Sequence, residues 1–350
     1  MATHCAFRLL FRSAALGAIA LIALGPMPAA AQGGEAAKPV PVTIENFVRA
    51  ESDLYFSKAT FGRLRHVRQI APIDRQEIVR MNRDTLYSSG VFDLEAAPLT
   101  ITLPDPGGRF MSMQVIDEDH YTIEVVYAPG AFTYTRDKVD TRYVIIIIRT
   151  LADPQKPDDL EAAHALQDKV KVEQASIGRL EFPSWDQASQ DRLRAILREI
   201  AKRHTGGAGV PFGTRNEVDP RAHLVGTAVG WGGSPRRAAI YRNVYPKAND
   251  GSTVYRLTVS DVPVDGFWSI SVYDRDGFFE KNVLGAYSVN SLTAKPGANG
   301  AFTIQFGDCH RDTPNCLPIM PGWNYTVRLY RPRSEILDGS WKFPEAAPVN

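Results

Sequence analysis

The chain has 350 residues, of which 44% are hydrophobic and 23% charged, and its formal net charge is +1 at pH 7. This composition is ordinary for a globular protein, and the near-zero charge argues against nucleic acid or an anionic membrane surface as a partner. The length allows two domains of roughly 150 residues each.

Residues 1–31 have the features of a secretory signal peptide. Arg8 and Arg12 form a basic start, residues 14–24 are apolar, and Ala29–Ala31 form an A-x-A cleavage site. The apolar run is too short to span a bilayer, which takes about 20 residues. We therefore expect cleavage near Ala31, a flexible leader over residues 32–41, no membrane span in the mature chain, and a periplasmic or secreted location.

A helix is expected from Thr43 to about Lys58, where apolar residues keep helical spacing behind a capping threonine. Residues 78–94, IVRMNRDTLYSSGVFDL, then place a dense polar group before a strand with a glycine bend. Charges beside a core strand need partners, because a desolvated charge costs several kcal/mol. The group is either a structural cluster that fixes the strand end or a ligand site, since arginine suits carboxylate, phosphate or sugar oxygens. Its members are Arg80, Asn82, Arg83 and Asp84, followed by Tyr87.

Alternating residues predict further strands at 99–103, 110–117 and 121–127, and a continuous apolar run predicts a strand buried on both faces at 142–150. The connection after residue 116 contains Asp117, Glu118, Asp119 and His120. Three carboxylates and an imidazole there could bind a hard divalent cation or position a base, or could simply form a polar loop.

The period then changes to helical. We expect helices over 158–174, after a capping box at 184–187, and from Asp219–Pro220 to the glycines near residue 230. The glycine cluster lacks the lysine and the preceding strand of a phosphate loop, so we interpret it as a tight linker.

The last third returns to strands, expected at 254–259, 267–274, 287–292, 301–306 and 325–330. One side of these strands is polar and includes Tyr273 and Arg328. Such a face is either exposed to solvent or the floor of a cleft that binds a saccharide or carboxylate.

Cys309 and Cys316 remain after removal of the signal peptide. In an oxidising compartment, two cysteines that close a short loop favour a disulfide. A metal site that includes His310, Asp308 or Asp312 is the alternative, although this cysteine spacing is not a standard zinc spacing.

Several motifs resemble a known pair of families. VRMNRDTLYSSGVFDL at 79–94 resembles the DUF1254 family, and DGFWSISVYDRDGFFEKN at 265–282 resembles the DUF1214 family, as do NCLPIMPGWNYTVRLYRP at 315–332 and LDGSWKFP at 337–344. The resemblance implies an exported cell-envelope protein with a mainly β, α+β fold of two jelly-roll-like β-sandwich domains. We expect these domains at 42–175 and 246–350, joined by a helical bridge at 176–245. Cys316 stands where the family pattern has tryptophan, which supports a local disulfide.

The sequence contains no G-x-S-x-G, H-E-x-x-H, Walker A or Rossmann motif, so no cofactor and no metal centre is expected apart from the metal alternatives at Asp117 and at the Cys309–Cys316 loop. One hypothesis is an enzyme that acts on a polar small molecule or envelope saccharide by acid–base chemistry. A second is a non-catalytic ligand-binding protein, and a third is a purely architectural role; a homo-oligomer is left open. In the enzyme hypothesis, Asp84 or Asp117 is the base, Arg80 and Arg83 hold an anionic group, and Tyr87 or Tyr273 donates a proton, while Asn82, His120 and Arg328 bind the ligand.

Overall fold

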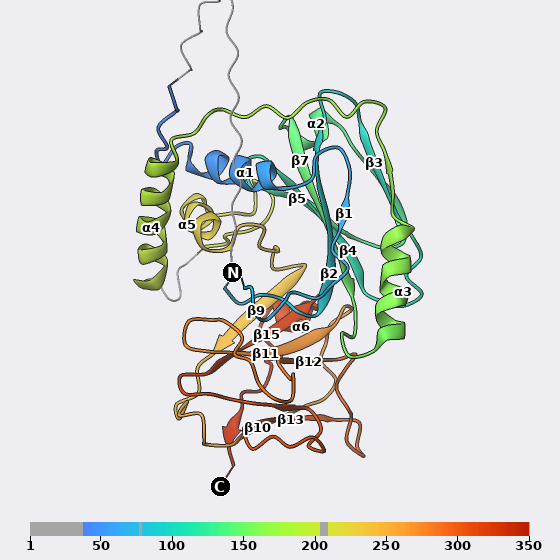
Figure 1. The fold of residues 1–350 in the computed structure, drawn as a ribbon, viewed down its shortest axis with the longest axis vertical. Helices are drawn as coiled ribbons and strands as arrows, with labels where there is room; N and C mark the ends of the chain where they lie inside the picture. Colours follow the sequence, from blue (N-terminus) through green and yellow to red (C-terminus); the bar gives the residue numbers. More distant parts are fainter. Residues whose placement is uncertain (1–37, 77–78, 204–208, 350) are drawn as a thin grey trace, which may run out of the picture. The chain divides into compact units, whose positions relative to one another are not determined.

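The computed structural model describes residues 38–76, 79–203 and 209–349. The predicted signal peptide, and the predicted leader up to residue 37, lie outside these residues. Within them, no helix is both long and apolar enough to cross a membrane. From Pro39 onward the chain forms one unit, and its described residues contain 16 strands in four sheets and six helices. This architecture confirms the expected mainly β, α+β class (Figure 1).

The first β-sandwich packs a five-stranded sheet, in the order β1-β2-β7-β4-β5, against a three-stranded sheet, β6-β3-β8. Every neighbouring pair is antiparallel. Ile101, Met113 and Ile146 belong to the fully buried core of this sandwich, as the alternation of apolar residues requires. The elements are β1 (Arg65–His66), β2 (Thr85–Asp93), β3 (Leu99–Leu103), β4 (Met111–Asp117), β5 (Thr122–Tyr127), β6 (Gly130–Tyr134), α2 (Arg136–Val139), β7 (Tyr143–Leu151) and β8 (Lys171–Glu173).

Three helices form a separate cluster beside this sandwich (Figure 1). They are α1 (Phe47–Lys58), α4 (Gln187–Arg203) and α5 (Pro220–Gly230), and they bury Phe47, Leu197 and Ala228 together. Asp219 caps α5 as expected, since its carboxylate accepts from the backbone N–H groups of Arg221 and Ala222. The second face of the five-stranded sheet packs on α1 through residues such as Val91 and Ile145, so both faces of β7 are covered.

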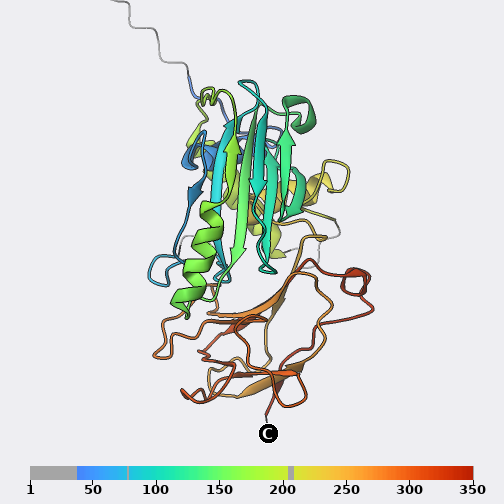
Figure 2. The ribbon, with the colours of Figure 1, turned by 90° about the vertical axis from the view of Figure 1, so that its right-hand side faces the viewer.

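The helix expected at 158–174 is shorter in the structure. Helix α3 (Pro157–Asp168) ends six residues early, and residues 171–173 form strand β8 instead. Val172 pairs with Ile101 and packs on the sandwich core, so tertiary burial outweighs the local helical pattern. Figure 2 shows α3 beside the strands of the first sandwich.

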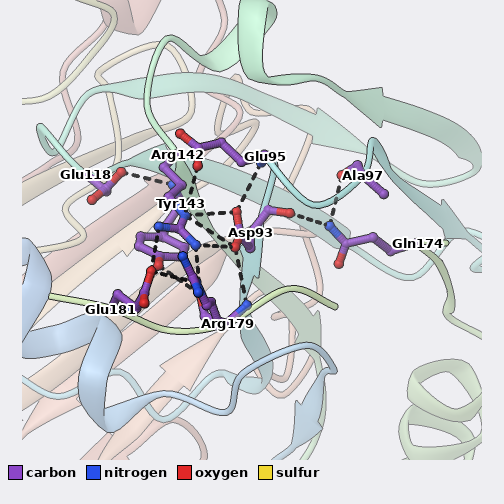
Figure 3. A network of polar contacts seen from close by, with 9 residues as sticks. All are labelled: Asp93, Glu95, Ala97, Glu118, Arg142, Tyr143, Gln174, Arg179 and Glu181. Carbon is purple, nitrogen blue, oxygen red and sulfur yellow. Dashed lines mark hydrogen bonds and ion pairs between the residues drawn. The ribbon is translucent and has the colours of Figure 1, made fainter. Parts of the chain in front are cut away.

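A polar network holds the segment that leaves this sandwich (Figure 3). Gln174 donates to the backbone oxygen of Asp93 at 2.8 Å, and Tyr143 donates to the backbone oxygen of Arg179 at 2.8 Å. Arg142 forms an ion pair with Asp93 at 2.9 Å. Burial alone would raise the pKa of Asp93, but its hydrogen bonds from Arg142 and from the Arg179 N–H outweigh burial and lower it. The network therefore holds the start of the predicted helical bridge, near Arg179, against strand β2.

The second sandwich packs the sheet β12-β11-β15-β9 against the sheet β14-β13-β10-β16. Ile270, Ile304 and Trp323 belong to its buried core. Strand β9 pairs with β15 and so joins this sandwich, although it falls within the range expected as a helical bridge. The elements are β9 (Ala239–Val244), β10 (Tyr255–Val259), β11 (Trp268–Tyr273), β12 (Ser288–Asn290), β13 (Phe302–Phe306), β14 (Cys316–Leu317), β15 (Asn324–Tyr330), α6 (Ser334–Leu337) and β16 (Ala347–Pro348).

The polar face of the sheet β12-β11-β15-β9 is buried over its two central strands. Ser271 and Tyr273 are 0% exposed and Arg328 is 2% exposed. Solvent exposure, one of the two expectations for this face, is therefore wrong for β11 and β15. The reason is that residues 80 and 81 supply backbone oxygens that accept from these side chains.

Candidate functional site

The segment at residues 79–84 lies on the polar face of the second sandwich. The Arg80 N–H donates to the backbone oxygen of Gly277 at 2.8 Å, and the Tyr273 hydroxyl donates to the backbone oxygen of Met81 at 2.8 Å. Arg328 donates to the backbone oxygen of Arg80 at 2.8 Å. Because the chain continues from this segment into β2 of the first sandwich, these bonds tie the two sandwiches together.

Both terminal nitrogens of the Arg80 guanidinium bond to residues of the second half of the chain. It donates to Asn324 Oδ1 at 2.6 Å, to Thr326 Oγ1 at 3.1 Å and to the Tyr245 hydroxyl at 2.7 Å. Its Cζ also lies 5.6 Å from the Tyr245 ring centre and 5.5 Å from that of Tyr273. These contacts satisfy Arg80 within the protein, so its position fits a structural tie better than a ligand contact.

Arg328 is the buried centre of this contact. It donates to Ser271 Oγ at 2.9 Å and to the Tyr273 hydroxyl at 2.6 Å, besides its bond to the Arg80 backbone. Burial opposes its charge, but the nearby tyrosine oxygens and the Asp84 carboxylate outweigh burial and raise the pKa of Arg328. Tyr273 and Arg328 thus bond to the segment at residues 79–84 and do not face an open cavity.

Asp84 is sealed inside the protein at 0% exposure. Its Oδ1 accepts from Asn290 Nδ2 at 3.0 Å, whereas its Oδ2 has no hydrogen-bond partner among the described residues. The backbone N–H of Asp84 bonds to Asn82 Oδ1 at 2.8 Å. Asn290 lines the hollow described below, whereas Asp84 itself does not.

Arg83 differs from its neighbours because it lines an open hollow of about 630 Å³. Its Cζ lies 5.3 Å from the ring centre of Tyr287 and 5.8 Å from that of Phe279. No described residue forms a hydrogen bond or ion pair with the Arg83 side chain, and burial lowers its pKa despite the nearby Asp84. Ligand pockets of small molecules have about this volume. Other polar groups in the lining include Asp153, Asn290, Lys295, His310, Arg311 and Asp312.

The disulfide loop forms one wall of this hollow. Cys309 and Cys316 are bonded with a Cα–Cα distance of 5.5 Å, which confirms the expected bridge. Residues 310–316 all line the hollow. Asn315 anchors the loop to Lys295 through two hydrogen bonds of 2.8 Å. The disulfide closes the loop that carries Arg311, one of the cationic residues of this wall.

The second predicted group, around Asp117, forms its hydrogen bonds and ion pairs with other residues of the protein. Asp117 Oδ1 accepts from the N–H groups of Asp119 at 3.0 Å and Tyr121 at 2.8 Å, and burial raises the pKa of Asp117 to about 7. Asp119 forms ion pairs with Arg49 at 2.7 Å and with Arg215 at 3.4 Å. These contacts account for both carboxylates within the protein.

His120 is a buried structural histidine in the neutral form. Its Nε2 accepts from the Gly232 N–H at 2.8 Å, so its Nδ1 carries the proton that faces Thr227 Oγ1 at 2.7 Å. Burial, with a smaller contribution from His223, lowers the pKa of His120 well below its usual value. In the described part of the chain, no group of three or more His, Cys, Asp or Glu side chains could hold a metal ion.

The structure also brings in residues that the sequence did not single out. Arg149 is 8% exposed on β7, and it pairs in register with Tyr87. Asn82 Nδ2 lies 3.2 Å from the hydroxyls of both Tyr87 and Tyr330. A single arginine near the end of the apolar run RYVIIIIRT was the available signal for Arg149. Nothing local marked Asn290 as the partner of Asp84.

Together these features define a protein of two β-sandwiches in which a polar segment of the first docks on the second. The family model "Protein of unknown function (DUF1254)" matches residues 61–174, and "Protein of unknown function (DUF1214)" matches residues 242–334. The chain belongs to the family that combines these two domains. No curated protein matches it.

Two solved structures are similar. The VPA0106 protein from Vibrio parahaemolyticus is 19% identical, with a TM-score of 0.67 over 88% of this chain and 98% of that chain. An uncharacterised protein from Burkholderia cenocepacia is 13% identical, with a TM-score of 0.48 over 83% of this chain and 84% of that one. The first of these supports the fold.

Proposed function

We propose that this protein binds a small anionic molecule, such as an acidic saccharide, in the hollow lined by Arg83. The observation that carries the proposal is that the Arg83 guanidinium faces this hollow without a hydrogen-bond or ion-pair partner among the described residues. A partly buried guanidinium without a counterion gains free energy when a carboxylate or phosphate supplies two hydrogen bonds to it.

The other charges of the hollow favour the same ligand class. Lys295 and Arg311 line it together with Arg83, whereas Asp153 and Asp312 are its only carboxylates among the described residues. Asp153 is paired with Lys156 at 3.3 Å, which leaves the hollow with a net positive charge. The rings of Phe279 and Tyr287 behind Arg83 limit its movement and so reduce the entropy lost on binding.

We place this binding protein outside the cytoplasm, in the periplasm or cell envelope. The basic start, the short apolar run and the A-x-A site at residues 1–31 support export. The Cys309–Cys316 disulfide is consistent with an oxidising compartment.

Binding without conversion is the form of the hypothesis that the hollow supports best. Asp84, the nearest expected base, has no exposed surface, and Asn290 stands between its Oδ1 and the hollow. A general base must come within hydrogen-bond reach of the proton it removes, directly or through one water. The contacts of Arg80 and Arg328 support the architectural hypothesis for the rest of the polar cluster, because they join the two sandwiches.

A ligand-induced stabilisation screen tests the proposal. Wild type, Arg83→Ala and the matched control Arg236→Ala, an exposed arginine outside the hollow, are melted with galacturonate, glucose 6-phosphate, simple dicarboxylates and neutral glucose. Acidic probes should raise the melting temperature of wild type and of Arg236→Ala but not that of Arg83→Ala, and glucose should have no effect. If no acidic probe stabilises wild type at millimolar concentration, or if Arg83→Ala responds like wild type, the proposal is wrong.

A further inference from the structure

A second hollow, of about 610 Å³, lies where the two sandwiches meet. Residues 108–111 and 127–129 of the first sandwich line it, together with residues 265–267 and Arg331 of the second. Most of its lining side chains are apolar, whereas most of those around the Arg83 hollow are polar. Small-molecule pockets often lie at such junctions and have about this volume. The two hollows are therefore suited to ligands of different chemistry.

Three aromatic side chains of the second hollow pack together. The ring centre of Phe110 lies 5.0 Å from that of Phe267 and 5.9 Å from that of Tyr127, so the two sandwiches contact each other here. Phe267 is 1% exposed, which holds this part of the lining in place before any ligand binds. Leu292, in the same lining, keeps 41% of its surface exposed. An apolar ligand group gains free energy when it covers these side chains and excludes water from them.

Arg331 supplies a guanidinium to this lining. Its Cζ lies 4.3 Å from the ring centre of Tyr127, and no described residue forms a hydrogen bond or ion pair with its side chain. A guanidinium that lies over a ring keeps its N–H groups available to an acceptor. The Arg331 backbone is held on both sides, because its N–H donates to the Ala238 oxygen and its oxygen accepts from the Asp265 N–H, each at 2.9 Å. The backbone that carries this cation is thus positioned before a ligand arrives.

The other charged side chains of the second hollow have partners within the protein. Arg109 forms an ion pair with Asp159 at 2.6 Å, and the Asp265 carboxylate bonds to Arg333 at 2.7 Å rather than to the guanidinium over Tyr127. Asp105 is exposed and accepts from a backbone N–H two residues further on, at 2.9 Å. Among the described residues, the lining therefore offers one cation without a counterion, together with two carboxylates. This arrangement favours a ligand with one negative charge and opposes a second charge.

We propose that the second hollow binds a monocarboxylate with an apolar body, such as an aromatic acid. The ligand carboxylate accepts hydrogen bonds from the Arg331 guanidinium, and the apolar body covers Phe110 and Leu292. A carboxylate paired with arginine by two hydrogen bonds fixes the orientation of the ligand, while the removal of apolar surface from water adds affinity. A sugar acid lacks the apolar body, and a dicarboxylate brings a second charge beside the two carboxylates of the lining. The inference does not depend on ligand binding at Arg83.

Isothermal titration calorimetry of the purified protein with benzoate tests this proposal. Benzoate should bind wild type, and it should bind Arg331→Ala at least tenfold more weakly, as expected for the loss of hydrogen bonds from a charged group. Benzyl alcohol, which has the ring without the charge, and phthalate, which has a second charge, should each bind wild type at least tenfold more weakly than benzoate. The control Arg236→Ala changes an exposed arginine outside the second hollow and should keep the affinity of wild type.

A second variant tests the apolar part of the hollow at a residue whose exposure makes misfolding a lesser concern. Leu292→Glu places a carboxylate where the apolar body would lie, and it should weaken benzoate binding at least tenfold. Its matched control is Leu337→Glu, because Leu337 is 38% exposed, close to the 41% of Leu292, and lies outside the second hollow. This control should bind benzoate as wild type does.

Several results would overturn the proposal. They are the absence of benzoate binding to wild type at millimolar concentration, equal affinities for benzoate and benzyl alcohol, and unchanged benzoate affinity in folded Arg331→Ala or in Leu292→Glu. Arg83→Ala separates the two hollows, because benzoate should still bind this variant; a loss of benzoate binding there would assign benzoate to the Arg83 hollow instead. Failure of galacturonate to bind wild type would contradict the proposed function alone and leave the benzoate result unaffected.

Discussion

Replacing Arg328 with methionine tests whether the contact between the polar segment and the second sandwich depends on one buried guanidinium. The variant loses charged hydrogen bonds to Ser271 Oγ at 2.9 Å, to the Tyr273 hydroxyl at 2.6 Å and to the Arg80 backbone oxygen at 2.8 Å. A hydrogen bond to a charged group contributes about 1.5–3 kcal/mol, but such values do not add when the bonds share one residue.

The Asp84 carboxylate would also remain buried without the cation that stabilises it. Breaking a buried ionic network costs about 3–5 kcal/mol, and methionine recovers part of this by filling the space with apolar atoms. We therefore expect Arg328→Met to lower the free energy of unfolding by about 3–4 kcal/mol. For roughly 310 residues, the entropy of unfolding converts this loss to a decrease of about 5–6 °C in melting temperature.

Urea unfolding with linear extrapolation gives the free energy directly, and differential scanning calorimetry gives the melting temperature. Arg256→Met is the matched control, because Arg256 is an exposed arginine on β10 that bonds to a side chain of its own sheet. It should cost less than about 1 kcal/mol. A loss below 1 kcal/mol for Arg328→Met would refute the reasoning, since the segment at 79–84 would then be held by other contacts.

Three further predictions concern stability. Burial raises the pKa of Asp53 from 3.8 to about 7, so the folded protein holds this proton up to neutral pH and its free energy of unfolding falls as pH rises from about 4 to about 7. Asp53→Asn should remove this fall. The variant should match wild type below pH 4 and be more stable than wild type by up to about 4 kcal/mol above pH 7. Unfolding curves that keep a constant separation at all pH values would contradict this assignment. Removing the disulfide by Cys309→Ser with Cys316→Ser should cost about 2.5 kcal/mol and weaken anion binding, because the loop forms a wall of the hollow; unchanged affinity would separate the loop from the site. Asn290→Ala leaves the sealed Asp84 carboxylate without its hydrogen bond and should cost about 2 kcal/mol in urea unfolding, and a neutral result would mean that this hydrogen bond does not stabilise the fold.

Local periodicity predicted most of the strands, because alternation reports which side chains enter the core. Strand β3 begins and ends at the expected residues, and β7 agrees within one residue at each end. Periodicity was wrong where tertiary contacts decided the outcome. Val172 makes residues 171–173 an edge strand because it pairs with Ile101 and reaches the core of the first sandwich.

The candidate site was only partly predictable for a related reason. The sequence marks Arg80, Arg83 and Asp84 as a dense polar group, but it does not show which of them meets a partner. The partner of Arg80, Asn324, is 244 residues away in the chain. Pairing of this kind depends on how the two sandwiches meet. For the same reason, Arg80 bonds to the second sandwich and Asp84 is fully buried, whereas Arg83, alone of the three, lines the hollow.

The most direct test of anion binding at Arg83 is isothermal titration calorimetry of galacturonate with wild type and with Arg83→Ala. A charged hydrogen bond contributes about 1.5–3 kcal/mol, and 1.4 kcal/mol corresponds to a tenfold change in Kd. We predict measurable binding to wild type and at least tenfold weaker binding to Arg83→Ala, with affinity that falls as salt concentration rises. Equal affinity of the two proteins, or no heat of binding for wild type, would contradict a binding site at this arginine.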